Sequence, residues 1–177
     1  MSGNPSILGK EISPKADVGA IVEKLLGAYA DEWVAGYYYM LTAELVQGPL
    51  SGVVAEQFRR EAEEEITKHA AAIASRLAEL GVEPPREFSR LWEISPCKYP
   101  PLPEDPYDVD GFIIAAVKAE ACAVKAYREL YDLTHGVDPV TEELAEELLA
   151  DEVRHRTELM SLLTRDGMER LRRELEG

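Results

Sequence analysis

The sequence lacks long apolar runs, and this shortage excludes an integral membrane protein. No run approaches the roughly 20 apolar residues that are needed to span a bilayer, so we expect no membrane association. The N-terminal stretch MSGNPSILGKEISPKAD has neither a basic start nor an apolar core, which argues against a signal peptide. We therefore expect a cytoplasmic location.

Basic residues are also scarce. The 177 residues include 19 Lys and Arg against 34 Asp and Glu, and the formal net charge is −15. Proteins that bind a phosphate backbone need a basic surface, and an extended N-terminal tail (residues 1–16) offers only Lys10 and Lys15. We therefore expect no DNA binding. An acidic surface attracts cations instead.

Cysteine and strand signals are the remaining shortages. Cys97 and Cys122 are the only two cysteines, too few for the disulfide framework of a small secreted protein, although they could pair. Alternation with a period of two, hairpin turns and internal repeats are absent as well. The length suits a single domain over residues 1–177 with a substantial core.

What the sequence does contain is helical periodicity. Four segments carry apolar residues three and four apart, at about residues 17–46, 53–80, 108–134 and 139–163. Asp17 and Asp138 are suitable N-caps, Pro139 suits the first helical position, and Gly81 suits a helix C-terminus.

The connections between these segments predict the topology. Residues 82–107 hold seven of the eleven prolines, so they form a long crossover, with a short helix near REFSRLWEI. The other two connections are short and make antiparallel hairpins. We predict an all-α, ferritin-like four-helix bundle with one long crossover between its second and third helices. Residues 165–177 are expected to add a short C-terminal helix or tail.

An acid interrupts each of the four apolar stripes, and in two helices a histidine follows it. A buried, unpaired carboxylate costs several kcal/mol, and two divalent cations would balance four of them. Carboxylates and imidazoles suit Fe²⁺ or Mn²⁺, and the sequence offers no thiolate cluster for zinc. The predicted ligands of this two-metal site are Glu32, Glu65, His69, Glu120, Glu152 and His155.

The second helix carries an irregular version of this pattern. The fourth helix has Glu-x-x-His, from Glu152 to His155, as in di-iron bundles, whereas in EEEITKH (residues 63–69) the acid on the core stripe, Glu65, stands four residues before His69. Such a pair can reach one metal, particularly if the helix carries a π-bulge. Glu63 and Glu64 are rotated away from the stripe, and we predict that they form a solvated acidic face.

Three other residues have several possible roles. Tyr39 and Tyr127 fall on inward stripes, where they either pack in the core or act beside the metal ligands. His135 suits a helix C-terminus.

Five segments in the same order resemble the Dps-like (DPSL) proteins, or thioferritins, of the ferritin-like superfamily. They are DEWVAGYYYM, EEEITKHA, ISPCKYPPLPEDP, EACAVKAY and DEVRH, and the resemblance covers about residues 20–163. Thioferritins carry one cysteine in the crossover and one just after the glutamate of the third helix. The resemblance therefore implies that Cys97 and Cys122 form a disulfide or redox pair, although each alone could be a small buried apolar residue.

The resemblance also implies a function. It implies two iron ions per subunit (manganese is possible), oxidation of Fe²⁺ with H₂O₂ or O₂, storage of the mineral in a homo-oligomeric cage of twelve subunits, and protection from oxidative stress. By analogy with di-iron bundles, Glu32, Glu65 and His69 hold one iron, and Glu120, Glu152 and His155 the other. In the same analogy Glu65 and Glu152 bridge the two ions.

Two other classes of function use the same bundle. One is a non-storing di-metal oxidase or a manganese catalase. A rubrerythrin-type peroxidase is less favoured, because the sequence has no Cys-x-x-Cys pair. The other class is a metal-free helical interaction module, which would need basic residues on the stripes that face the acids. The sequence places none there.

Overall fold

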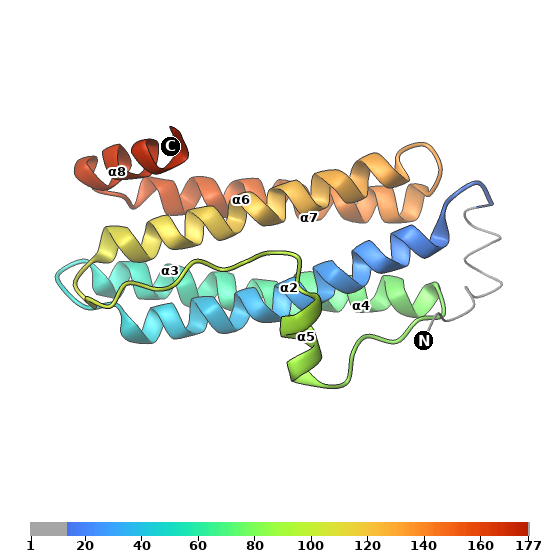
Figure 1. Cartoon of the computed structure of the whole chain (residues 1–177), viewed down its shortest axis with the longest axis horizontal. Helices are drawn as coiled ribbons and strands as arrows, with labels where there is room; N and C mark the ends of the chain where they lie inside the picture. The colour runs from blue at the N-terminus through green and yellow to red at the C-terminus, as the bar shows by residue number, and fades with distance from the viewer. Residues whose placement is uncertain (1–13, 177) are drawn as a thin grey trace.

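The computed structural model describes residues 14–176. Most of the predicted N-terminal tail, residues 1–13, lies outside the described residues, and the extent of the single domain stays a prediction. Four long helical rods run along the long axis of the molecule (Figure 1). The first rod is α2 (Val18–Leu45). The second consists of three consecutive segments, α3 (Ser51–Glu64), η1 (Glu65–His69) and α4 (Ala70–Glu79). The third and fourth rods are α6 (Val109–Thr134) and α7 (Pro139–Ser161). Within residues 14–176 there is no β-strand.

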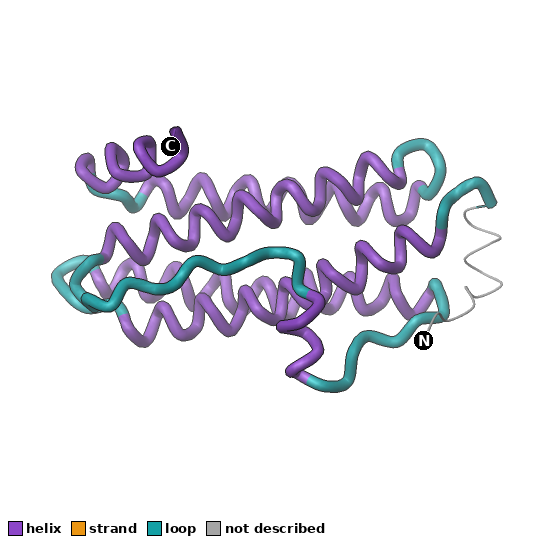
Figure 2. Tube along the Cα trace, in the orientation of Figure 1, coloured by secondary structure: helices purple, strands orange, loops and turns teal. Residues whose placement is uncertain are grey.

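The connections follow the predicted topology. Short turns join α2 to α3 and α6 to α7, whereas the segment between α4 and α6 crosses the bundle along its length (Figure 2). The short helix α5 (Phe88–Ile94) lies in this crossover, as predicted. The C-terminal helix α8 (Arg165–Glu176) folds back at one end of the bundle (Figure 1).

Local sequence signals set the helix ends. The carboxylates of Asp17 and Asp138 accept backbone N–H bonds from Ala20 and Thr141, at 3.1 and 3.3 Å, which satisfies donors that the first turn leaves free. Gly81 has a positive φ of 75° directly after the rod that ends in α4, a conformation that glycine adopts without strain. The predicted caps are therefore confirmed.

The core has two apolar parts separated by a polar layer. On α2, one part contains residues up to Ala28 and the other begins at Ala35, with Glu32 between them. On α7, one part contains Leu148 and the other contains Leu159. The other two rods repeat this arrangement, so the apolar ends of the bundle hold a middle layer of acids and histidines in place.

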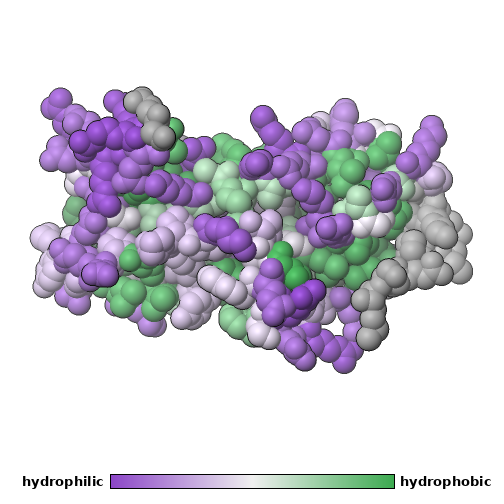
Figure 3. Space-filling view, viewed as in Figure 1, coloured by the Kyte–Doolittle hydropathy of each residue, from purple (hydrophilic) through white to green (hydrophobic). Residues whose placement is uncertain are grey.

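Figure 3 shows hydrophilic side chains over α8 and over the region of α5, with hydrophobic side chains between the rods. Among the residues described, no helix combines the length and the apolar character that crossing a membrane requires.

Candidate metal centre

The polar layer brings together all six side chains that the sequence predicts as ligands. Each is at most 3% exposed. Their donor atoms form two overlapping sets, and within each set the atoms lie within 4.8 Å of one another. One set is Glu32, Glu65, His69 and Glu152; the other is Glu65, Glu120, Glu152 and His155. Glu65 and Glu152 belong to both sets, so they lie where the two sets of donor atoms meet.

Both imidazoles turn Nδ1 toward the carboxylates. Nδ1 of His69 lies 2.7 Å from Glu65 Oε2, 3.2 Å from Glu152 Oε1 and 3.4 Å from Glu32 Oε2. Nδ1 of His155 lies 3.3 Å from Glu65 Oε1. The two rings stack with their centroids 5.6 Å apart. The inward nitrogens thus face the carboxylate oxygens across the centre of the layer.

Several of these buried atoms have no hydrogen-bond partner. They are Glu120 Oε2, Glu152 Oε1 and His155 Nδ1. Glu152 Oε1 is near His69 Nδ1, but the single proton of that nitrogen is better placed for Glu65 at 2.7 Å. Buried polar atoms are rarely left unpaired because each costs about 1–3 kcal/mol. Carboxylate oxygens and imidazole nitrogens are ligands that Fe²⁺ and Mn²⁺ accept, so the buried clusters are compatible with a di-metal site.

The charges in this layer repel one another when no cation is bound. Burial, and then the charge of Glu65, raise the pKa of Glu152 to about 8. Burial also raises the pKa of Glu65 and of Glu120 well above the usual value, with a further contribution from the neighbouring glutamates. Burial alone lowers the pKa of His69, but hydrogen bonds with Glu152, Glu32 and Glu65 outweigh it and raise this pKa. Without metal, protons must therefore supply the missing positive charge.

We expect the metal-free protein to lose stability as the pH rises from about 5 to 8. A carboxyl whose pKa is higher in the folded state than in the unfolded state holds its proton longer when folded, so folding is favoured less as the pH increases through that interval. A tenfold difference between the two acid dissociation constants corresponds to about 1.4 kcal/mol of stability. Glu152, with a folded-state pKa of about 8, and His69, whose pKa is also raised, act in the same direction.

The measurement is the melting temperature in EDTA between these pH values. Adding Mn²⁺ should remove most of the slope, because the cation replaces the protons. The Glu152→Gln variant should show a shallower slope in EDTA than the wild type. A melting temperature that rises with pH in EDTA would contradict the raised pKa values of these two side chains.

Two tyrosines donate hydrogen bonds to the acids of the centre. Tyr39 Oη donates to Glu120 Oε1, and Tyr127 Oη donates to Glu32 Oε1. Both tyrosines are at most 2% exposed, and burial, followed by the neighbouring carboxylate, raises the pKa of each phenol well above its usual value. The phenols therefore stay protonated and orient one oxygen of each acid, leaving the other oxygen for the centre.

The irregular helix contains a π-helical segment, η1, over Glu65–His69. The backbone N–H of Ala70 donates to the carbonyl of Glu65, five residues earlier, which is the π-helical hydrogen bond. This widened turn brings His69 and Glu65 together at 2.7 Å despite their spacing. Gly36 on α2 makes room for the widened turn, because a Cβ there would lie 2.6 Å from the Ile66 side chain. The π-bulge that would favour the Glu-x-x-x-His pair is therefore present.

The prediction for Glu64 is wrong. Its side chain is only 26% exposed, and its Oε2 lies 3.2 Å from His155 Nε2. In the same way, Oδ2 of Asp151 lies 3.4 Å from His69 Nε2. The rotation that takes Glu64 off its own core stripe turns it toward α7, so it contacts a neighbouring helix and is only partly exposed to solvent. Glu63 is exposed, as predicted.

Each of these outer acids lies against the outward nitrogen of one imidazole. When a cation displaces the proton from Nδ1, a carboxylate beside Nε2 can accept a hydrogen bond from that nitrogen, as is usual for metal-binding histidines; at His155, Arg154 Nη2 also lies 3.3 Å from Nε2. Helical periodicity does not identify Glu64 and Asp151 as neighbours of the histidines, although the sequence carries another signal for them. In both helices an acid directly precedes the inward glutamate, as EE in EEITKH and DE in DEVRH.

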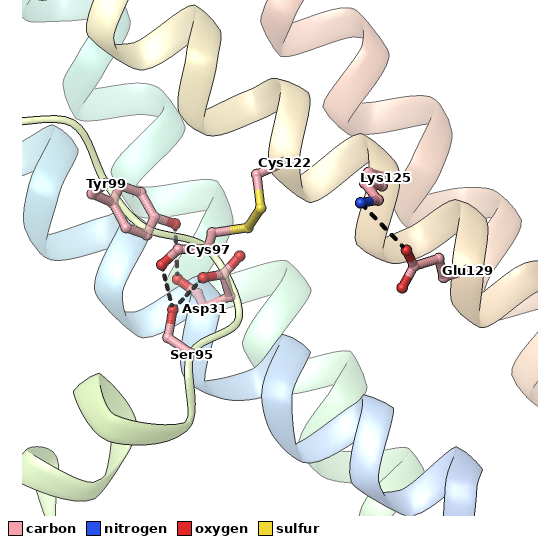
Figure 4. The surroundings of a disulfide bond; sticks show 7 residues. All are labelled: Asp31, Ser95, Cys97, Tyr99, Cys122, Lys125 and Glu129. Carbon is pink, nitrogen blue, oxygen red and sulfur yellow. Dashed lines mark hydrogen bonds and ion pairs between the residues drawn. A yellow bond between two sulfur atoms is a disulfide. The ribbon is translucent and has the colours of Figure 1, made fainter.

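The crossover covers one side of the centre. Ser95 Oγ donates to Asp31 Oδ1, and Tyr99 Oη donates to the Asp31 carbonyl oxygen at 3.3 Å (Figure 4). Asp31 is 4% exposed, and burial, only partly offset by Ser95, raises its pKa to about 7. Asp31 and Glu32 line a small cavity together with Tyr99 and Ala123. Sequence periodicity could not identify Asp31 as buried, because a loop and not a helix covers it.

Cys97 and Cys122 form a disulfide that joins the crossover to α6 (Figure 4). Their Cα atoms are 5.8 Å apart and 25 residues separate them in sequence. In the chain-entropy description, closing a loop of this length stabilises the folded state by about 3 kcal/mol. Cys122 is the neighbour of Ala123, which lines the small cavity, so the disulfide lies next to the covered side of the centre.

Comparison with known proteins gives consistent matches over most of the chain. The sequence model of the ferritin-like domain family matches residues 22–168. A DNA protection during starvation protein of Pyrococcus furiosus is 33% identical over 148 residues, which are 84% of this chain and 79% of that protein.

Solved structures match as well. A dodecameric thioferritin from Bacteroides fragilis, a bacterioferritin-related protein, superposes with a TM-score of 0.79 at 32% identity, over 96% of this chain and 94% of that chain. The bacterioferritin of Rhodobacter capsulatus, with a metal-free dinuclear site, gives 0.63 at 26% identity over 80% and 82%. The predicted ferritin-like fold and the resemblance to Dps-like proteins and thioferritins are confirmed.

Proposed function

The chain belongs to the ferritin-like domain family, and on this premise we propose that it is a di-iron ferroxidase. It oxidises Fe²⁺ with H₂O₂, or with O₂, stores the oxidised iron in a protein cage and so protects the cell from oxidative stress. One observation carries the proposal. Two overlapping sets of buried carboxylates and histidines meet in the middle of the bundle, and several of their inward atoms have no partner.

The proposal assigns a role to each side chain of the centre. Glu32, Glu65 and His69 would hold one iron, Glu120, Glu152 and His155 would hold the other, and Glu65 and Glu152 would be shared between the two. The membership of these two glutamates in both ligand sets supports this assignment. Two ferrous ions bound there would supply the two electrons that convert one H₂O₂ and two protons into two molecules of water. Manganese is the alternative metal for the same ligands.

The surrounding residues hold the ligands and handle protons. The phenols of Tyr39 and Tyr127 fix one oxygen of Glu120 and of Glu32. Glu65 and Glu152, whose pKa values are raised, release their protons when a cation takes the place of those protons. We propose that the Cys97–Cys122 disulfide holds the crossover over the centre and is redox-active there.

We also propose that the subunits assemble into a homo-oligomeric cage of twelve in the cytoplasm. The similar protein from Bacteroides fragilis is a dodecamer. Large apolar side chains that remain exposed on α2 and α5, from 41% to 62%, are suited to contacts between subunits. They are Tyr37, Met40, Phe88 and Trp92. The net charge of −15 argues against DNA binding, although the Pyrococcus furiosus relative is named for DNA protection.

The alternatives differ in testable ways. A non-storing oxidase or a manganese catalase uses the same ligands but needs no cage, and a catalase releases O₂ from H₂O₂. The metal-free interaction module is disfavoured by the surroundings of the acids. Among the described residues the one buried base other than histidine is Arg76, and it pairs with Asp138 at 2.9 Å and not with the acids of the centre.

The experiment is an anaerobic titration of the metal-free protein with Fe²⁺, followed by H₂O₂. We expect two Fe²⁺ bound per subunit, two Fe²⁺ oxidised per H₂O₂ consumed, and little hydroxyl radical detected by a spin trap. Native mass spectrometry should give the mass of a twelve-subunit cage. Release of O₂ without oxidation of Fe²⁺ would favour a catalase. A protein that binds no Fe²⁺ would contradict the proposal.

A further inference from the structure

Glu61 is a buried acid that the dinuclear centre does not use. It lies on α3 and is 2% exposed. Its Oε1 accepts a hydrogen bond from Gln57 Nε2 at 2.8 Å, but its Oε2 is buried without a partner. A buried carboxylate oxygen without a partner is costly, and an apolar side chain would be more stable at such a position. The side chain therefore requires an explanation other than stability.

Its position extends the line of predicted ligands by one helical turn. Glu61 precedes Glu65 by four residues on the rod that contains α3, and Glu158 follows His155 by three residues on α7. Side chains at these spacings lie on the same face of a helix, about 5–6 Å apart. Burial, and then the charge of Glu120, raise the pKa of Glu61 to about 8. Among the neighbouring charges, that of Glu120 has the largest effect on this pKa.

Gln57 connects Glu61 to the surface. Its Nε2 donates both to Glu61 Oε1, at 2.8 Å, and to Glu158 Oε2, at 2.9 Å. One amide nitrogen therefore lies between two carboxylates, at a point where a cation would contact both. Gln57 is itself buried, whereas the side chain of Glu158 is 44% exposed. The group runs from solvent to the buried acid.

Two arginines complete the surroundings. Arg60 Nη2 donates to Gln57 Oε1, and Arg154 Nη1 lies 3.6 Å from Glu158 Oε1. Neither contacts Glu61. Rotation of the Gln57 amide, which gives up the hydrogen bond from the exposed Arg60, would present its oxygen to the point between the carboxylates and give a set of three oxygen ligands. Such sets bind Fe²⁺, Mn²⁺ and other cations that prefer oxygen.

We propose that Glu61, Gln57 and Glu158 form a third cation site, separate from the dinuclear centre, that binds a divalent cation on its way between the surface and that centre. The site opens to solvent at Glu158 and ends at the buried Glu61, one helical turn before Glu65 of the dinuclear centre. The passage of Fe²⁺ through it rests on the proposed function. The binding of a cation by these three residues does not.

The test counts Mn²⁺ ions bound to the metal-free, full-length protein by the loss of the free-ion EPR signal. We expect three per subunit in the wild type and two in Glu61→Gln. Glu56→Gln, at an exposed position of the same helix, is the matched control and should bind three. A crystal soaked in Mn²⁺ should show an anomalous peak within bonding distance of Glu61 that is absent from the variant.

The outcomes separate this proposal from the proposed function. Two ions in both the wild type and Glu61→Gln would overturn the third site and leave the dinuclear centre intact. A single ion that Glu61→Gln removes would support the third site and contradict the dinuclear centre. If Glu61→Gln does not fold, Glu158→Gln at the half-exposed end should lower the count from three to two, and an unchanged count of three there would overturn the proposal.

Discussion

Replacement of Glu65 by glutamine is expected to remove both cations from the dinuclear centre and to slow Fe²⁺ oxidation at least about 100-fold. Changing a residue that only supports a metal ligand already lowers metal affinity or activity about 10–100-fold. Glu65 belongs to both sets of predicted ligands, so its loss should have a larger effect. Its Oε2 lies 2.7 Å from His69 Nδ1 and its Oε1 lies 3.3 Å from His155 Nδ1. The glutamine has nearly the same volume but removes the charge that both positions share.

The same substitution should stabilise the metal-free protein. Burial and the charge of Glu32 raise the pKa of Glu65 well above its usual value, so at neutral pH folding must either protonate this acid or bury its charge, and an uncharged amide removes that cost. The measurements are Mn²⁺ stoichiometry, the rate of Fe²⁺ oxidation and the melting temperature in EDTA. Glu63→Gln, at the exposed position two residues earlier, is the control and should behave as the wild type. A Glu65→Gln protein that binds both cations would show that another acid serves this helix.

The sequence alone predicts most of the fold because its signals are local. Caps such as Asp17 and Asp138 act within one turn of their own helix, and the apolar stripe of each helix can be read from periodicity. An acid on that stripe, such as Glu120, is conspicuous because its burial without compensation is unfavourable. The prediction that four such acids meet therefore needed only the antiparallel order of the helices.

The residues that the sequence did not identify are those whose burial depends on other segments. Asp31 is buried because the crossover carrying Ser95 covers it. Glu64 contacts His155 because α3 and α7 are adjacent at that height, and Glu61 is buried by the same packing. Periodicity within one helix gives the core stripe but not the rotation of neighbouring helices, so acids at the edge of a stripe look solvated in the sequence.

Repetition within the sequence could have recovered part of this information. The acid before each inward glutamate, Glu64 or Asp151, lies against Nε2 of the histidine on the opposite helix. The two helices thus each contribute an outer acid, an inward glutamate and a histidine, and each outer acid contacts the histidine of the other helix. The difference between them is one additional residue before His69, which the π-helical turn of η1 absorbs.

Because of that additional residue, two single-residue deletions in this region should have opposite effects on cation binding. Deletion of the exposed Thr67 should leave a regular α-helix with Glu-x-x-His spacing and retain the binding of two cations. The helix no longer needs the turn in which Ala70 N–H donates to the Glu65 carbonyl, and both flanks keep their rotation. The loss is small, chiefly the hydrogen bond from Thr67 Oγ1 to the Glu63 carbonyl.

Deletion of the exposed Ala71, only four residues later, should abolish cation binding. If η1 persists, α4 rotates by about 100° and takes Ile73 and Leu77 out of the core, at a cost of roughly 1.5–3 kcal/mol for each. If η1 is lost instead, α4 keeps its place but His69 rotates out of the centre. Mn²⁺ stoichiometry and melting temperature distinguish the two deletion proteins. Equal loss of cation binding in both would show that the π-helical turn is itself required, and not merely a means of fitting an additional residue.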